Sequence, residues 1–354
     1  MTVSAHIWIG TNAKDGGDHE GIWRMDRPAS GQSWGARPAQ LATEATAPTF
    51  LALHPSADRL YAVVESVAGA VASYDVDARC GLTRTRVAPS GGEGPCHLLV
   101  HPQGRWLYAT NYGDGTVGAI ELTESGDVSD RLVALRHTGS GPDPDRQAGP
   151  HAHSSILSPG QGYLIVADLG TDELRAYALD GGRPDLEPVL TALPPGCGPR
   201  HMVVNGDHLY LACELSGEVL VVRWDEERGR GSVVQRLAAA TLPGRSKDVH
   251  QLSHILIAHG VVLVGVRGAD SISTFAVHDD GARLELVGEI PTATWPRHMA
   301  VVGSDLVVAG ERADVLVVHP FGTSSADERG SWVGAVGPIH DELVLPNPMC
   351  VLPL

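Results

Sequence analysis

The chain has 354 residues, of which 43% are hydrophobic, 42 are glycine and 24 are proline, while only 5% are aromatic. This composition favours many short strands joined by tight turns. The formal net charge of −16 argues against binding to nucleic acid or to an anionic membrane, since both require a basic surface.

No apolar run is long enough to span a bilayer, and the first residues lack the basic and apolar regions of a signal peptide. Five cysteines are present, and none of them forms a Cys-x-x-Cys motif. An odd number of unpaired cysteines is typical of reduced, buried thiols. The sequence therefore predicts a cytoplasmic protein, either a monomer or a homodimer.

Six segments repeat one pattern at intervals of about 50 residues, which is typical of the blades of a β-propeller. In chain order they span residues 47–66, 94–117, 149–174, 198–219, 252–272 and 295–316. Each begins near a proline, or in one case at Leu252, and continues as an apolar strand, a polar turn and a second apolar strand. A third strand follows, as in residues 116–122, 173–179, 218–224 and 271–277.

The two ends of the chain complete a seventh unit. Residues 346–354 supply one strand, and residues 6–12 and 21–26 supply a second and a third. We therefore predict an all-β fold, a single seven-bladed β-propeller domain over residues 1–354, whose N- and C-terminal strands share one blade and close the ring. A β-sandwich is the alternative, but it does not explain the regular spacing.

Polar residues recur where the first strand of a blade begins and where the antiparallel second strand ends, so they should meet at one mouth of the channel. The strand starts carry His97, His151, His153, Arg200, His201, His254, Arg297 and His298, and the second strands end at Asn111, Asp168, Glu214, Arg267 and Glu311. In the first blade Phe50 breaks this pattern, with Glu65 near the rim. Because burying charges near an axis is costly, this ring predicts a binding site for a small anionic molecule.

Each of these residues also has a purely structural interpretation, since a histidine or aspartate at a strand start can bind turn backbone. A strand that begins at Pro150 would place His151 and His153 on one face, where they could ligate a metal with Asp168. The nearby arginines would repel a cation, so we predict neither a metal site nor a cofactor. The sequence contains no P-loop motif.

The loop over residues 139–149 is rich in glycine and proline and directly precedes the histidine pair. Its length suits a flap over the channel mouth, although a solvated connector would have the same composition.

The segments GPHAHSSILSPGQGYLIVADLGTDELRAY, GPRHMVV…YLACELSGEV and VRGADSISTF closely resemble signatures of the seven-bladed lactonase family. This family contains bacterial 6-phosphogluconolactonases and fungal-type carboxy-muconate lactonizing enzymes. The resemblance extends over essentially the whole chain. It implies an active site built from His153, Arg200, Glu214 and Arg267, with His151 as a neighbour.

Two departures from the family pattern concern the mouth of the channel. Gly310-Glu311 stands where the family often has Asn-Gln, and Val266 stands where an asparagine usually precedes Arg-Gly. These changes leave the identity of the substrate open.

The favoured function is hydrolysis of a small anionic lactone. Arg200 and Arg267 would bind its phosphate or carboxylate, His153 would act as general base, and Glu214 would orient that base or accept a substrate hydroxyl. The second interpretation is a cycloisomerase that closes a lactone ring at the same site. The third is a propeller without catalytic activity that binds a partner on its face.

Overall fold

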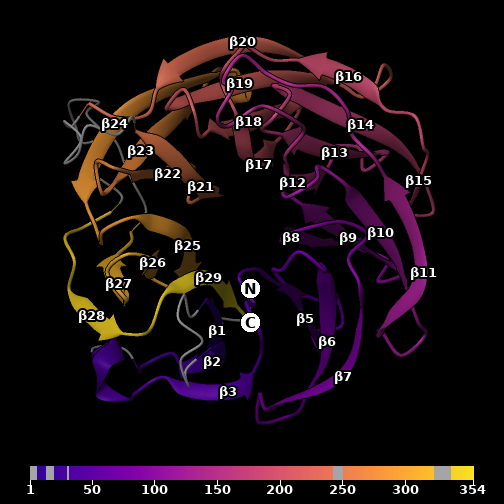
Figure 1. The fold of residues 1–354 in the computed structure, drawn as a ribbon. Helices are drawn as coiled ribbons and strands as arrows, with labels where there is room; N and C mark the ends of the chain where they lie inside the picture. Colours follow the sequence, from indigo (N-terminus) through magenta and orange to yellow (C-terminus); the bar gives the residue numbers. More distant parts are fainter. Residues whose placement is uncertain (1–5, 13–19, 30–31, 242–249, 323–335) are drawn as a thin grey trace.

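The computed structural model describes residues 6–12, 20–29, 32–241, 250–322 and 336–354. Seven antiparallel sheets surround a central channel, with the inner strand of each sheet beside the axis (Figure 1). The predicted seven-bladed β-propeller is confirmed. The described residues also contain two short 3-10 turns, η1 (Trp34–Ala36) and η2 (Asp279–Gly281).

The blades are numbered here by the order in which their channel strands occur, and the strands of each blade follow from the axis outward. Blade 1 has β4 (Leu51–Leu53), β5 (Arg59–Val64), β6 (Ala70–Val76) and β7 (Leu82–Pro89); blade 2 has β8 (Pro95–Val100), β9 (Trp106–Asn111), β10 (Val117–Leu122) and β11 (Val128–Leu135). Blade 3 has β12 (Ala152–Leu157), β13 (Tyr163–Asp168) and β14 (Glu173–Asp180), with β15 (Arg183–Pro184) and β16 (Val189–Ala192) both pairing with β14.

The later blades follow the same plan. Blade 4 has β17 (Pro199–Asn205), β18 (His208–Cys213), β19 (Glu218–Asp225) and β20 (Arg230–Ala238); blade 5 has β21 (Gln251–Ala258), β22 (Val261–Arg267), β23 (Ser271–His278) and β24 (Arg283–Pro291). Blade 6 has β25 (Pro296–Val302), β26 (Asp305–Gly310), β27 (Val315–Pro320) and β28 (Asp341–Val344); blade 7 has β29 (Pro348–Pro353), β1 (His6–Thr11), β2 (Gly21–Asp26) and β3 (Gln40–Glu44).

Blade 7 joins the two ends of the chain, as the sequence predicted. The C-terminal β29 is its channel strand and pairs antiparallel with β1, with Ile9 opposite Val351. The C-terminus lies near the centre of the ring (Figure 1). Closing the ring with strands from both ends gives β1 and β29 partners and removes two free edges.

Apolar side chains on both faces of the middle strands pack between neighbouring blades. In the cluster between blades 3 and 4, Ile165 and Ala167 of β13 pack with Leu209 and Leu211 of β18. All four side chains are fully buried. The continuous apolar second strands of the sequence repeat are thus the surfaces on which one blade packs against the next.

A repeated aspartate fixes the start of the next channel strand. Asp270 has a positive φ of 54°, and its carboxylate accepts a hydrogen bond from the Trp295 backbone N–H at 2.8 Å. Asp172, with φ of 55°, accepts from the N–H groups of Gly196 at 2.6 Å and Gly198 at 2.7 Å. Aspartate tolerates this left-handed backbone, and its side chain links consecutive blades.

Most channel strands are interrupted near their start by a β-bulge. In blades 2, 3, 4 and 6 the pairing register shifts across a single residue, namely Cys96, His153, Arg200 or Arg297. A bulge leaves the extra residue out of the ladder and redirects its side chain. These four positions are therefore equivalent around the axis.

Candidate functional site

A cavity of about 330 Å³ lies at one mouth of the channel, and its walls come from two rows of equivalent residues. The four bulge residues form one row, and residues at or directly after the ends of the second strands form the other. The lining residues are Glu65, Cys96, Tyr112, Arg146, His153, Arg200, Glu214, Gln251, Arg267, Trp295, Arg297, Glu311 and Arg312. The six predicted residues His153, Arg200, Glu214, Arg267, Arg297 and Glu311 are thus brought together in one cavity.

Glu214 lies among three arginines from three different parts of the chain. Its Oε2 is 3.0 Å from Arg200 Nε and 2.5 Å from Arg267 Nη2, and its Oε1 is 2.6 Å from Arg146 Nη2. Burial by itself would raise the pKa of Glu214, but the charges of Arg267 and Arg200 outweigh it and hold that pKa far below its usual value. Glu214 is therefore ionised at neutral pH and a weak base.

Backbone carbonyls hold two of these arginines in place. Arg200 donates from Nη1 to the Ser253 carbonyl at 2.7 Å, and Arg267 donates from Nη2 to the Leu252 carbonyl at 2.9 Å. Burial, together with the neighbouring arginines, lowers the pKa of Arg200 to about 9, so it remains charged at neutral pH. These contacts fix the guanidinium groups before any ligand arrives.

A second ion pair also lines the cavity. Arg297 Nη1 is 3.1 Å from Glu311 Oε2. Burial would lower the pKa of Arg297, but Glu311 and Glu65 more than offset this and raise it. The guanidinium of Arg312 lies over the Trp295 ring, 3.3 Å from its centroid. Of the two departures from the family pattern, Glu311 reaches the cavity, whereas Val266 is buried in the core beside it.

His153 is the histidine that reaches the cavity, and it lies between a thiol and two rings. Cys96 Sγ is 3.3 Å from the His153 carbonyl oxygen and 3.9 Å from its Nδ1. The rings of Tyr112 and His201 contact it edge-on. Burial, and secondarily Arg200, lower the pKa of His153 well below its usual value, so its imidazole is neutral at pH 7.

Four further predicted histidines lie in a layer of packed rings and are not among the residues that line the cavity. His97, His201 and His298 pack against Phe50 of blade 1, and His254 packs against His201 and His298. The Nδ1 atoms of His201 and His254 are 2.8 Å apart, and the rings of His254 and His298 stack at 3.9 Å. Burial is the main cause of a lowered pKa in all four, so they are neutral at pH 7.

His151 and Asp168 also lie outside the cavity lining. The expectation that His151 and His153 share one strand face is corrected, because β12 begins at Ala152 and the bulge then breaks the alternation. His151 stacks on Tyr112 and contacts its carbonyl oxygen at 2.7 Å. The fully buried Asp168 accepts from the His151 backbone N–H and lies 2.6 Å from His137 Nδ1.

Hairpin length differs between blades, so a distance along the chain from one blade does not apply to another. In blade 2, Leu98 pairs with Ala109, eleven residues later, whereas in blade 4 Met202 pairs with Leu211, nine residues later. The counterpart of the lining residue Glu214 in blade 2 is therefore Tyr112, one residue after the predicted strand end Asn111. A count from each blade's own hairpin turn could have found it.

Arg146 and Tyr112 are site residues that the sequence analysis did not identify. Arg146 belongs to the loop over residues 139–149, so this loop contributes directly to the cavity. Trp295, Gln251, Cys96 and Arg312 were also missed. They had no distinguishing motif, although Cys96 precedes His97 as Arg200 precedes His201.

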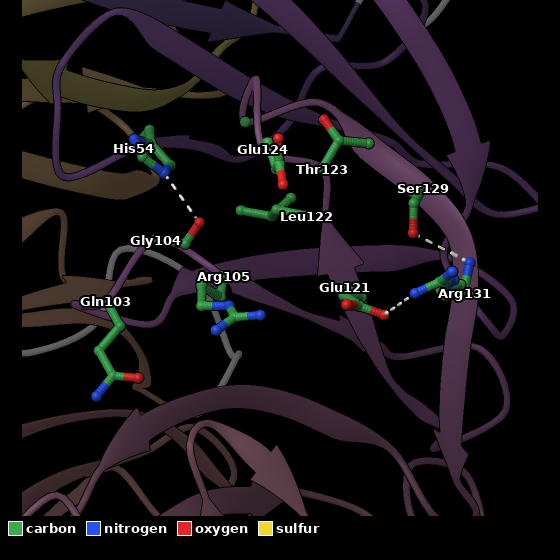
Figure 2. Close-up of a pocket in the computed structure, with 11 residues that line it drawn as sticks. His54, Gln103, Gly104, Arg105, Glu121, Leu122, Thr123, Glu124, Ser129 and Arg131 are labelled. Atoms are coloured by element: carbon green, nitrogen blue, oxygen red, sulfur yellow. Dashed lines mark hydrogen bonds and ion pairs between the residues drawn. The ribbon is translucent and has the colours of Figure 1, made fainter.

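A larger groove of about 780 Å³, called the outer groove, is lined by turns and strand residues of blade 2 and by His54 of blade 1. Its residues include Glu121 and Arg131, which face one another, and His54 and Arg105, which lie apart from this pair (Figure 2). Arg131 pairs with Glu121 at 3.3 Å and is 81% exposed. Because its charged groups are solvated and do not converge, the smaller channel cavity is the better candidate for chemistry.

Among the described residues, no group of three or more histidine, cysteine or acidic side chains has the arrangement to hold a metal ion. A search of the same residues for helices long and apolar enough to cross a membrane finds none.

Comparison with known proteins identifies the family. The sequence model of the family described as lactonase, 7-bladed beta-propeller, matches residues 6–353. The chain belongs to this family. A 6-phosphogluconolactonase from Bacillus subtilis is 29% identical over 358 residues, and the match covers 97% of each chain.

Solved structures show the same fold. A Lactobacillus plantarum protein superposes with a TM-score of 0.83 at 25% identity, covering 99% of both chains. The periplasmic gluconolactonase of Pseudomonas aeruginosa superposes with a TM-score of 0.80 at 24% identity, covering 98% of both chains.

Proposed function

We propose that this member of the lactonase family hydrolyses a small anionic sugar lactone, of the 6-phosphogluconolactone type, in the channel cavity. The observation that carries this proposal is the charge of the cavity. Five arginines and three glutamates line it, so with His153 neutral its formal charge is +2. The whole chain carries −16, and so concentrated a positive site matches a phosphate dianion.

The residues have complementary roles in this proposal. The oxygen of a water molecule bonds to the lactone carbonyl carbon while His153 accepts the water proton. Arg200 or Arg267 stabilises the negative charge that develops on the carbonyl oxygen. The bond from the carbonyl carbon to the ring oxygen then breaks, and the ring oxygen takes up a proton, which gives a hydroxy acid. Glu214 orients the water or accepts a substrate hydroxyl.

Binding of an anion would also prepare His153 for this role. Arg200 is one cause of the low pKa of His153, so a phosphate beside Arg200 would partly offset that cause and make the imidazole more basic. The base is thus expected to be strongest when the substrate is bound.

The test is turnover of 6-phosphogluconolactone, unphosphorylated lactones and muconates, followed by acid release and ultraviolet absorbance. Wild type should hydrolyse the phosphorylated lactone, and His153→Ala and Arg200→Ala should lower kcat/KM by about 100-fold or more. No turnover of any compound would contradict hydrolysis, and unchanged turnover in both variants would contradict the site.

A cycloisomerase remains the second candidate, because the same arginines and proton-transfer group would serve ring closure. It would form product from a muconate and not from a lactone, so the same assay separates the two reactions. A propeller that only binds a partner would turn over neither compound. A cytoplasmic location and a monomeric or dimeric state remain predictions.

A further inference from the structure

Arg146 differs from the other two arginines at Glu214 in its origin and exposure. It belongs to the loop over residues 139–149 between β11 and β12, whereas Arg200 and Arg267 belong to β17 and β22. Its side chain is 34% exposed, compared with 3% for Arg200 and 5% for Arg267. Arg146 is therefore the arginine of this cluster that an incoming ligand meets from solvent.

Arg146 is also held by fewer fixed groups. Arg200 and Arg267 each donate to a buried backbone carbonyl as well as contacting Glu214 Oε2. Arg146 contacts Glu214 Oε1, and its next hydrogen bond, to the Tyr112 hydroxyl, is long at 3.4 Å. Moving its guanidinium would thus leave the other two arginines undisturbed.

The backbone that carries Arg146 is anchored. The neighbouring Gln147 is fully buried and donates from Nε2 to the Leu169 carbonyl at 2.8 Å and to Asp172 at 2.9 Å. The Arg146 N–H donates to Asp143 at 3.1 Å. The side chain therefore extends from a fixed point toward Glu214, and it can turn toward a ligand without movement of the loop.

We propose that Arg146 recognises the anionic group of the substrate and releases Glu214 Oε1 when it does so. A phosphate dianion offers more charge and more acceptor oxygens than one carboxylate oxygen already shared among arginines. The released Oε1 then accepts a hydrogen bond from a substrate hydroxyl or from the attacking water, while Oε2 keeps Arg200 and Arg267. An anionic lactone thus completes the site, and a neutral lactone leaves Glu214 held by Arg146.

This inference rests on the proposed function, and its kinetic test compares two substrates in the variant Arg146→Gln. KM for 6-phosphogluconolactone should rise about tenfold or more, because a charge-assisted contact is lost. The kcat/KM for the unphosphorylated lactone should fall by a much smaller factor than that for 6-phosphogluconolactone, because the unphosphorylated lactone has no phosphate for Arg146 to bind. The control Arg131→Gln alters an exposed arginine of the outer groove (Figure 2) and should change neither value.

A binding experiment separates failure of the inference from failure of the proposed function. Inorganic phosphate is titrated calorimetrically into wild type, Arg146→Gln and the control Arg131→Gln, and only Arg146→Gln should weaken binding about tenfold or more. Equal loss for both lactones, or unweakened phosphate binding in Arg146→Gln, would overturn the assignment to Arg146. If neither lactone is turned over, the proposed function fails, and the phosphate titration still decides the role of Arg146.

Discussion

At the scale of single residues, the cavity combines charges that are fixed with an imidazole that stays neutral. Glu214 remains ionised because Arg267 and Arg200 compensate its burial, and His153 remains neutral because the charge of Glu214 does not offset burial and the charge of Arg200. A buried carboxylate that stays ionised beside a buried imidazole that stays neutral is typical of sites that transfer protons.

The pH dependence of hydrolysis should reveal the low pKa of His153. A general base works in its unprotonated form, so activity is lost only when the pH falls through the lowered pKa. For the unphosphorylated lactone, which has no phosphate titration of its own, kcat/KM should show no inflection near the ordinary histidine value of about 6.5. An acidic limb centred there would contradict a buried, neutral base.

Glu311 should reduce the positive charge available to an anion, because it is paired with Arg297. In Glu311→Gln the formal charge of the cavity rises by one, and Arg297 loses its partner. We expect KM for the phosphorylated lactone to fall by about threefold or more at low ionic strength, with little change in kcat. Steady-state kinetics at low and high salt measure this; a raised KM would contradict it.

At the scale of elements, the β-bulges and the aspartates with positive φ position the cavity residues. A bulge in the channel strand presents Arg200 toward the cavity, and Asp172 fixes the backbone just before that strand. Asp172 also accepts from Gln147, next to Arg146. One buried carboxylate therefore links two of the three segments that carry arginines to Glu214.

Removing this carboxylate should affect stability and activity together. In Asp172→Gly the positive φ remains acceptable, so the variant reports the lost hydrogen bonds without backbone strain. Unsatisfied buried donors should lower the free energy of unfolding by about 2–4 kcal/mol, measured by urea titration, and kcat/KM should fall as well. The control Asp130→Ala removes an exposed partner of Arg86 and should change little. Wild-type stability in Asp172→Gly would contradict this role.

At the scale of the whole molecule, the ring closes through strand pairing and packing, with no covalent link between its ends. Cys80, Cys96, Cys197, Cys213 and Cys350 are all buried free thiols. The inner strand β29 is buried along Met349, Cys350 and Val351, and it gives β1 its inner partner. Stability therefore depends on both ends of the chain at once.

Deleting residues 348–354 should prevent folding. The deletion removes β29, uncovers the fully buried Ile7 and Ile9, and leaves β1 as a free edge beside the channel. We expect an insoluble chain or one without a cooperative thermal transition in circular dichroism. Deleting Leu354 alone should leave the transition nearly intact, and a cooperative transition in the longer deletion would contradict closure by β29.

The channel histidines should make the protein sensitive to acid. His97, His153, His201, His254 and His298 have lowered pKa values in the folded state, with those of His97 and His298 at about 3. Below about pH 6.5 the unfolded chain binds protons that the folded chain does not, so stability falls as the pH decreases. Each histidine contributes up to about 1.4 kcal/mol per pH unit. Urea unfolding between pH 7 and pH 5 should show this loss, and His254→Gln should reduce its slope.

The repeat of about fifty residues was enough to predict the blades, their number and the shared closing blade, because strand pairing follows local apolar patterns and the spacing is regular. The regular spacing also predicted that His153, Arg200, Glu214 and Arg267 lie at one mouth of the channel. These features depend on residues that lie close together in the sequence, within one blade, so they can be predicted from a single sequence.

Only the tertiary structure decided which polar residues face the cavity. Bulges break the alternation that links His151 to His153. Asn111 and Asp168 lie one position before the counterparts of Glu214 in their blades, and one position reverses the direction of a strand side chain. Arg146 reaches Glu214 from a loop whose path is set by contacts with the next blade. Loop paths and bulges depend on packing between residues far apart in the sequence, so no local sequence pattern predicts them.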